Sequence, residues 1–125
     1  MSPTPRRRLG SQGEGHARRY LERRGYRLLA ANWHCAAGEL DLVMRDGDEI
    51  VGVEVKTRRG EGAGRAEEAI SPAQRRRLLA AAEWFLAEHP EWDDLIWRID
   101  LVAITLDAGG AVRRVTHLPN VVEVS

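Results

Sequence analysis

The sequence has few of the residues that covalent or metal cross-links require. Its single cysteine, Cys35, excludes an intramolecular disulfide framework and any zinc or iron–sulfur site built on several cysteines. The four histidines have no metal-ligand spacing with Cys35, so a zinc site is not expected. Apolar packing must therefore stabilise the domain, and a hydrophobic content of 43% is sufficient for one core.

Long apolar runs are also absent. No run approaches the ~20 residues that a membrane-spanning helix needs, so a membrane protein is not predicted. Residues 1–10 are polar and arginine-rich and lack the apolar stretch of a secretory signal. We therefore expect a cytoplasmic protein with no membrane partner.

Lysine is nearly missing. Lys56 is the only lysine among 19 basic residues, and the other 18 are arginines. The compact ammonium group of lysine differs chemically from the planar guanidinium of arginine. The position of a single lysine can arise by chance, so the significance of Lys56 for function depends on the residues around it.

The chain as a whole has no excess of positive or negative charge, but its two halves do. The formal net charge is zero, which argues against a uniformly basic nucleic-acid binder. Residues 1–60 carry twelve basic and eight acidic groups, whereas residues 61–125 carry seven basic and eleven acidic groups. This polarity permits a basic face without establishing one.

The length of 125 residues fits one domain. Residues 1–10, with the run Arg6–Arg8, are interpreted as a mobile basic arm, which is either a solvated tail or a contact for phosphates. Residues 11–125 are expected to form a single domain in the order α-β-β-β-α-β-β, a mixed sheet covered by two helices. The expected elements are a helix over 11–24, strands over 26–34, 39–45 and 49–57, a helix starting at Ser71 and Pro72, and strands over 95–106 and 111–117.

Charged residues interrupt the second and third predicted strands. In each strand two charged side chains share one face, because side chains alternate along a strand, and apolar neighbours take the other face. The charged residues are Glu39, Asp41, Glu54 and Lys56, and the alternating apolar residues are Leu40, Leu42, Val53 and Val55. Ordinary core strands avoid this pattern, because an unpaired buried charge is costly.

The turn at residues 46–48 decides how these charges meet. A two-residue loop there has two registers, one with Asp41 opposite Glu54 and one with Glu39 opposite Glu54. Either register gathers the four charged residues on one face. A three-residue loop would instead place Asp41 opposite Val53, so the interpretation depends on the turn.

Two opposed carboxylates at roughly 5 Å repel each other unless a cation lies between them. Mg²⁺ or Mn²⁺ with oxygen ligands suits such a position, with Asp41 and Glu54 as the metal ligands. The chemistry that matches is metal-assisted hydrolysis of a phosphodiester, with Lys56 orienting the attacking water and stabilising developing negative charge. The alternative is a strand-face salt-bridge cluster of Lys56 with Glu54 or Glu39.

The spacing D-x12-E-V-K on a hairpin resembles the catalytic signature of the PD-(D/E)xK nucleases. The wider pattern resembles the YraN family, bacterial proteins similar to archaeal Holliday-junction resolvases. The matching motifs are G-E-x-x-A at 13–17, Y-L at 20–21, G-Y at 25–26, N-W at 32–33, G-E-L-D-L at 38–42, V-E-V-K-T-R at 53–58 and R-I-D-L-V-A at 98–103. The resemblance implies a restriction-endonuclease-like α/β fold, a mixed β-sheet flanked by helices.

The resemblance also implies that Glu14, on the first helix, is the acid that completes the metal site and joins Asp41, Glu54 and Lys56 in the catalytic set; the alternative is a solvated helix residue. The family often has lysine where this chain has Gln74, which could weaken a phosphate contact there. The candidate nucleic-acid-binding residues are Arg58, Arg59, Gln74 and Arg75. A solvated loop is the alternative for Arg58 and Arg59.

These observations favour a metal-dependent nuclease that hydrolyses phosphodiester bonds of duplex or branched DNA. Cleavage of a junction would favour a homodimer with two sites. One alternative is a non-catalytic nucleic-acid-binding module of the same fold, and another is a protein-interaction domain. Metal titration separates them, because an enzyme should bind Mg²⁺ or Mn²⁺ through Asp41 and Glu54.

Overall fold

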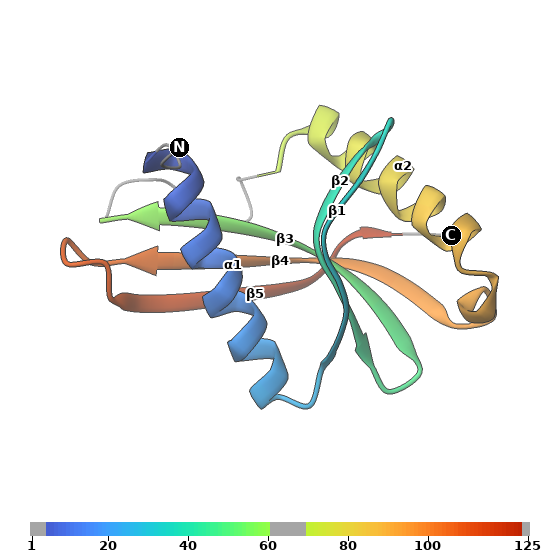
Figure 1. Cartoon of the computed structure of the whole chain (residues 1–125), viewed down its shortest axis with the longest axis horizontal. Helices are drawn as coiled ribbons and strands as arrows, with labels where there is room; N and C mark the ends of the chain where they lie inside the picture. The colour runs from blue at the N-terminus through green and yellow to red at the C-terminus, as the bar shows by residue number, and fades with distance from the viewer. Residues whose placement is uncertain (1–4, 61–69, 124–125) are drawn as a thin grey trace.

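Two helices lie against the two faces of one five-stranded sheet (Figure 1). The computed structural model describes residues 5–60 and 70–123, and describes side chains over residues 12–60 and 70–122. The elements are α1 (Pro5–Arg23), β1 (Arg27–Cys35), β2 (Gly38–Asp46), β3 (Glu49–Arg59), α2 (Pro72–Glu88), the short 3₁₀ helix η2 (Pro90–Trp92), β4 (Ile96–Leu106) and β5 (Val112–Glu123).

The strands lie in the order β1-β2-β3-β4-β5. The first three form an antiparallel meander, β3 pairs in parallel with β4, and β5 returns antiparallel beside β4. The parallel pair requires a crossover, and α2 lies within it. The predicted α/β class and the order α-β-β-β-α-β-β are thereby confirmed.

The core has two halves, one on each face of the sheet. Ile50 belongs to the cluster that includes Leu78 and Phe85 of α2, whereas its neighbour Val51 belongs to the cluster that includes Ala17 and Leu21 of α1. Adjacent residues of a strand point to opposite faces. The helices α1 and α2 therefore cover opposite faces.

Several boundaries differ from the expectation. Helix α1 begins at Pro5 rather than at Ser11, so residues 5–10 of the expected arm continue the helix, and residues 1–4 lie outside the described part. Strand β5 continues past Pro119, which an edge strand tolerates because its unpaired side needs no N–H donor. Strand β3 continues past the expected end at residue 57 and includes Arg58 and Arg59, so these two residues do not lie in a loop; residues 61–69 are outside the described residues.

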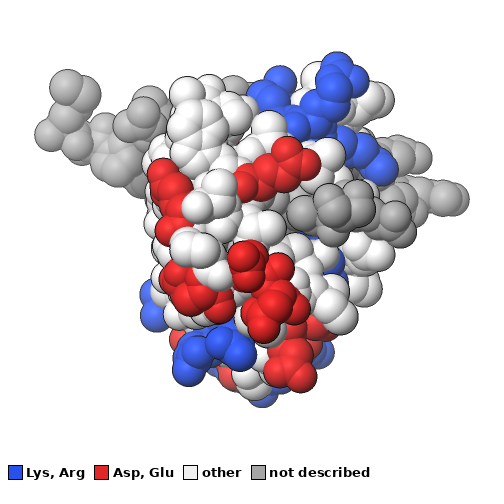
Figure 2. All heavy atoms as spheres, turned by 90° about the vertical axis from the view of Figure 1, so that its right-hand side faces the viewer, with Lys and Arg blue, Asp and Glu red and all other residues white. Residues whose placement is uncertain are grey.

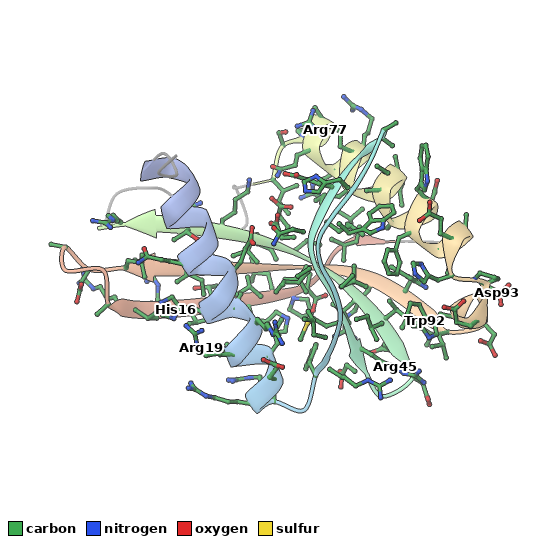
Figure 3. All side chains as sticks on the ribbon, viewed as in Figure 1. His16, Arg19, Arg45, Arg77, Trp92 and Asp93 are labelled. Atoms are coloured by element: carbon green, nitrogen blue, oxygen red, sulfur yellow. The ribbon has the colours of Figure 1, made fainter. Side chains whose placement is uncertain are left out.

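Aromatic side chains pack at the far end of α2. Trp97 is buried, Trp92 stacks on Phe85, and Trp84 donates its indole N–H to Glu88 at 3.2 Å. Trp92 lies beyond the C-terminal end of α2, whereas Arg77 lies near its N-terminal end (Figure 3). Trp92 and Trp97 therefore pack around Phe85, whereas Trp84 is exposed.

A polar network is buried on the α1 face. Asp100 is fully buried and accepts hydrogen bonds from Arg98 Nε at 3.1 Å, the backbone N–H of Asn120 at 2.8 Å and a ring nitrogen of His117 at 2.7 Å. Arg98 also donates to the Tyr26 hydroxyl at 2.9 Å. Asp100 therefore joins β4 to β5.

No helix within the described ranges 5–60 and 70–123 is both long enough and apolar enough to cross a bilayer.

Candidate active site

The site lies where β2 and β3 separate. Their backbone pairing runs from Asp46–Glu49 to Leu42–Val53, which is the predicted register with a 47–48 loop. Beyond Leu42–Val53 the two strands diverge, and the next residues of each strand are Asp41 and Glu54. β3 stays paired with β4 along its whole length, so it is β2 that departs.

The Asp41 side chain takes the position that a backbone partner would have had. Its Oδ2 accepts a hydrogen bond from the backbone N–H of Val55 at 2.8 Å. The carboxylate is thereby held across the separating strands, directly beside Glu54.

The departure of β2 overturns one expectation. Strict alternation would place Leu40 and Leu42 on one face, yet Leu40 packs in the α2 cluster and Leu42 in the α1 cluster. Leu40 lies next to Gly52, where an added Cβ would meet its Cδ2 at 3.6 Å. Strand β2 therefore turns between these leucines, and the turn directs Asp41 into the gap between the strands.

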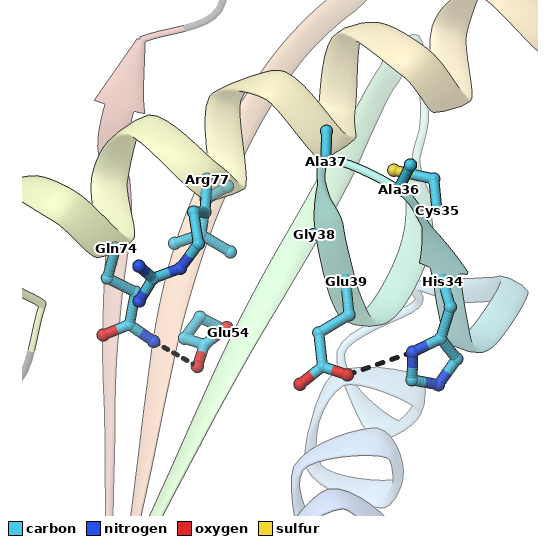
Figure 4. Close-up of a pocket in the computed structure, with 10 residues that line it drawn as sticks. His34, Cys35, Ala36, Ala37, Gly38, Glu39, Glu54, Gln74 and Arg77 are labelled. Carbon is cyan, nitrogen blue, oxygen red and sulfur yellow. Dashed lines mark hydrogen bonds and ion pairs between the residues drawn. The ribbon is translucent and has the colours of Figure 1, made fainter.

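Glu54 receives donors from two elements. Its Oε1 lies 3.3 Å from Lys56 Nζ and accepts a hydrogen bond from Gln74 Nε2, on α2, at 2.9 Å (Figure 4). The residue is only 7% exposed. The pKa of Glu54 is raised to about 7, mainly by burial and then by the Asp41 charge, whereas Lys56 opposes the shift.

The pKa of Asp41 is also subject to opposing effects. Burial raises its pKa above the ordinary aspartate value, and the hydrogen bond from Val55 opposes this. A buried and a half-buried carboxylate with one nearby ammonium group are under-compensated in charge, and a divalent cation with oxygen ligands would relieve this.

The site has two carboxylates in close reach rather than a closed ligand cage. Within residues 12–60 and 70–122, no three His, Cys, Asp or Glu side chains come together closely enough to enclose an ion. Mg²⁺ is commonly held by one or two carboxylates together with water and substrate phosphates. The donor set of Asp41 and Glu54 therefore fits such an ion.

Helix α1 brings Glu14 to this region. Gly13 packs so closely on β3 that an added Cβ would lie 1.6 Å from Thr57 Oγ1. Burial raises the pKa of Glu14, the Asp41 charge adds to this, and a hydrogen bond with the Asn32 side chain opposes it. Glu14 is thus within electrostatic reach of Asp41.

The family model described as "Uncharacterised protein family UPF0102" matches residues 13–104. The chain belongs to this family. The match confirms the resemblance inferred from the motifs, and the UPF0102 region includes all four predicted catalytic residues.

Relatives match the UPF0102 chain over nearly its whole length. A UPF0102 protein of Roseiflexus castenholzii is 48% identical over 94% of this chain and 95% of its own. One from Chloroflexus aurantiacus is 48% identical over 88% and 89%, and one from Pelotomaculum thermopropionicum is 43% identical over 92% and 95%.

Asn32 was missed as a site residue. It has a left-handed backbone, with φ of 51°, between the pairs Ala31–Leu42 and Trp33–Leu40, and its side chain bonds Glu14. Asparagine tolerates this conformation better than most residues do. The N-W motif was the only sequence signal, and it did not indicate a role.

Glu39 lies at the margin of the site. If the observed register continued, Glu39 would lie opposite Lys56, but the pairing of β2 with β3 ends at Leu42 and Val53. Its Oε2 lies 3.1 Å from His34 Nδ1 instead, and both side chains are mostly exposed. Its charge is a lesser cause of the raised pKa of Asp41.

The predicted nucleic-acid-binding residues occupy two places. Arg58 and Arg59 lie at the end of β3, two and three residues beyond Lys56. Gln74 contacts Glu54, and Arg75 Nη1 donates to the carbonyl of Val121 at 3.3 Å. Gln74 therefore belongs to the carboxylate site by contact.

Basic side chains lie on two sides of an acidic area on this face of the molecule. Figure 2 shows Lys and Arg side chains at the upper right edge and again at the lower left, with acidic side chains across the middle and lower part of the same face. Along α2 itself the charges are divided, with three arginines at 75–77 and glutamates at 83 and 88. A polyanion would be attracted to the arginine-rich end.

Proposed function

We propose that this chain is a metal-dependent nuclease that hydrolyses phosphodiester bonds in DNA. One observation carries the proposal: Asp41 and Glu54 meet where β2 leaves β3, and the only lysine of the chain lies 3.3 Å from Glu54. A structural salt bridge needs neither a second carboxylate beside it nor the interrupted strand pairing.

Asp41 and Glu54 would hold Mg²⁺ or Mn²⁺. When bound, such an ion would polarise a phosphate oxygen and lower the pKa of a water molecule. The hydrogen bond from Val55 fixes Asp41, and the hydrogen bond from Gln74 fixes Glu54. Both carboxylates are thereby preorganised, which spares the reaction the cost of ordering them.

Lys56 is placed to act on the reacting groups. Its ammonium group is partly exposed and adjoins Glu54, so it can donate to the attacking water or to a phosphate oxygen that gains charge. Glu14 adds a third carboxyl at the margin of the site, where it can accept a proton or a hydrogen bond from water.

DNA is proposed as the substrate because cationic groups flank these carboxylates. Arg58 and Arg59 extend from the same strand as Lys56, and the arginines at 75–77 follow Gln74. Phosphate contacts of this kind would position either duplex or branched DNA. Cutting both strands of a junction would need two sites, and hence a homodimer.

The experiment is a cleavage screen with Mn²⁺ over single-stranded, duplex, flap and four-way DNA. The proposal expects cleavage that EDTA stops and that Asp41→Asn abolishes, while Asp94→Asn, an exposed acid beyond η2, cuts normally. DNA binding without cleavage of any substrate would favour a non-catalytic module. Absence of both activities would favour a protein-interaction domain.

A further inference from the structure

A cleft opens directly beside the carboxylate site. It has a volume of about 460 Å³, within the range of small-ligand pockets. One wall is the tip of the β1–β2 hairpin and the other is the start of α2 (Figure 4). The side chains that matter to its chemistry are those of His34, Glu39, Glu54, Gln74, Arg77 and Leu78.

Close backbone packing fixes the width of the cleft. A Cβ at Gly38 would lie 3.1 Å from the carbonyl oxygen of Arg77, so the hairpin tip rests on the backbone of α2. Glu54 lines the cleft and also belongs to the carboxylate site. A group in the cleft would therefore lie next to whatever reacts at Asp41 and Glu54.

The lining suits a nucleobase better than a phosphate. Leu78 and the alanines at 36 and 37 give apolar surface, whereas Glu39 and Glu54 would repel a phosphate inside the cleft. A carboxylate can accept from the amino groups of a base. The side chain of Arg77 forms no hydrogen bond or ion pair with another described residue, so its guanidinium is available for stacking or for a phosphate at the rim.

We propose that this cleft binds one unpaired nucleotide of a DNA strand, next to the phosphodiester that is cut. The inference rests on the proposed nuclease function and deepens it. A base within a continuous duplex is stacked and paired and cannot enter a cleft of this size. The substrate class is therefore DNA with unpaired nucleotides, such as flaps, gaps and open junctions.

The first test measures binding without cleavage. In EDTA, fluorescence anisotropy compares a blunt duplex with the same duplex carrying a short single-stranded tail. The tailed duplex is expected to bind about tenfold more tightly, because stacking of a single base contributes roughly that factor. Arg77→Ala should remove the preference, whereas Arg76→Ala, which removes the same charge outside the cleft lining, should keep it.

The second test uses Cys35, the only cysteine, which lines the cleft. Intact-mass spectrometry follows its alkylation by N-ethylmaleimide. The tailed duplex should slow alkylation several-fold, and the blunt duplex should not. Equal protection by both DNAs, or equal affinity for both, would overturn the inference.

The outcomes separate the two proposals. A tail preference lost only in Arg77→Ala, without cleavage in Mn²⁺, would support the cleft and contradict the nuclease. Cleavage of blunt and tailed DNA at equal rates and equal affinities would support the nuclease and contradict the cleft. Loss of the preference in Arg76→Ala as well would attribute it to net charge and overturn the assignment of Arg77.

Discussion

Val55 donates its backbone N–H to the carboxylate of Asp41 over 2.8 Å, across two strands that have already separated. A side chain that substitutes for a backbone partner has both a structural and a chemical role. The two roles can be separated, because an amide keeps an oxygen that accepts from Val55 but loses the negative charge.

Asp41→Asn should therefore stay folded and lose metal binding. Saturating Mn²⁺ should raise the thermal midpoint of the wild-type chain, since a ligand at 100 times its Kd stabilises the folded state by about 2.7 kcal/mol. The midpoint of Asp41→Asn should not respond to Mn²⁺, whereas that of Asp94→Asn should. Differential scanning fluorimetry makes the comparison, and an equal response in all three proteins would place the ion elsewhere.

Lys56→Arg keeps the charge and changes the shape of the donor. If Lys56 orients the attacking water, the planar guanidinium misplaces its donors and cleavage should slow by on the order of 100-fold. DNA affinity should be retained, and circular dichroism should show an intact fold. Wild-type cleavage in this variant would remove Lys56 from the mechanism.

Two glycines of α1 form a matched pair. Gly13→Ala places a Cβ 1.6 Å from Thr57 Oγ1 and should destabilise the fold by about 1–3 kcal/mol, because α1 must move away from β3. At Gly15 an added Cβ meets only the flexible end of Arg19, at 3.4 Å. Gly15→Ala should therefore stabilise by about 0.5–1 kcal/mol. Urea unfolding measures both, and equal effects would contradict the close packing.

Asp100 predicts an acid-sensitive component of stability. Burial alone would raise its pKa, but hydrogen bonds from His117, the Asn120 backbone and Arg98 lower it below the ordinary aspartate value. The stabilisation is therefore complete above the unfolded pKa of about 3.9 and is lost as the pH falls through the lower folded value.

At neutral pH Asp100→Asn should lower the free energy of unfolding by about 1.5–3 kcal/mol, because its hydrogen bonds with Arg98 and His117 lose the carboxylate charge, while Arg98 keeps its ion pair with Glu49. The difference from wild type should shrink as the pH falls below about 4. Denaturant titrations at several pH values test this, and a difference independent of pH would show that Asp100 does not titrate as proposed.

DNA binding should depend on salt despite the zero net charge. Each phosphate contact contributes a slope of roughly −0.9 in log K against log salt on duplex DNA. Replacing both Arg58 and Arg59 by alanine should make that slope shallower, by the amount that one to two phosphate contacts contribute. Affinities measured over a salt series provide the test, and an unchanged slope would remove the end of β3 from the interface.

Local patterns predicted the parts of the fold that depend on local structure. Ser71 caps α2 by accepting from the backbone N–H of Gln74 at 3.1 Å, with Pro72 in the first turn, as the Ser-Pro pair indicated. The turn signal at 46–48 predicted a hairpin and allowed two registers with a two-residue loop, and the structure has the one that pairs Asp46 with Glu49. Both features depend on a few neighbouring residues, and so a sequence pattern can specify them.

Tertiary contacts determined what the patterns could not predict. The hydrogen bond from Gln74 to Glu54 depends on where α2 docks, and that from Asn32 to Glu14 depends on where α1 meets β1. The placement of Leu40 under α2 follows from the departure of β2, which no alternation of side chains reveals. Each involves residues distant in sequence, whose relative positions only the folded chain sets.

The meander of β1, β2 and β3 also has a kinetic consequence. Asp41 and Glu54 belong to one hairpin, so only a short loop must close before they meet, whereas the parallel pairing of β3 with β4 must wait for a much longer segment that includes α2. We expect the two carboxylates to come together early in folding and to face each other before Gln74 arrives. Their repulsion then acts on the folding chain itself, and a divalent cation that binds the hairpin would speed its formation.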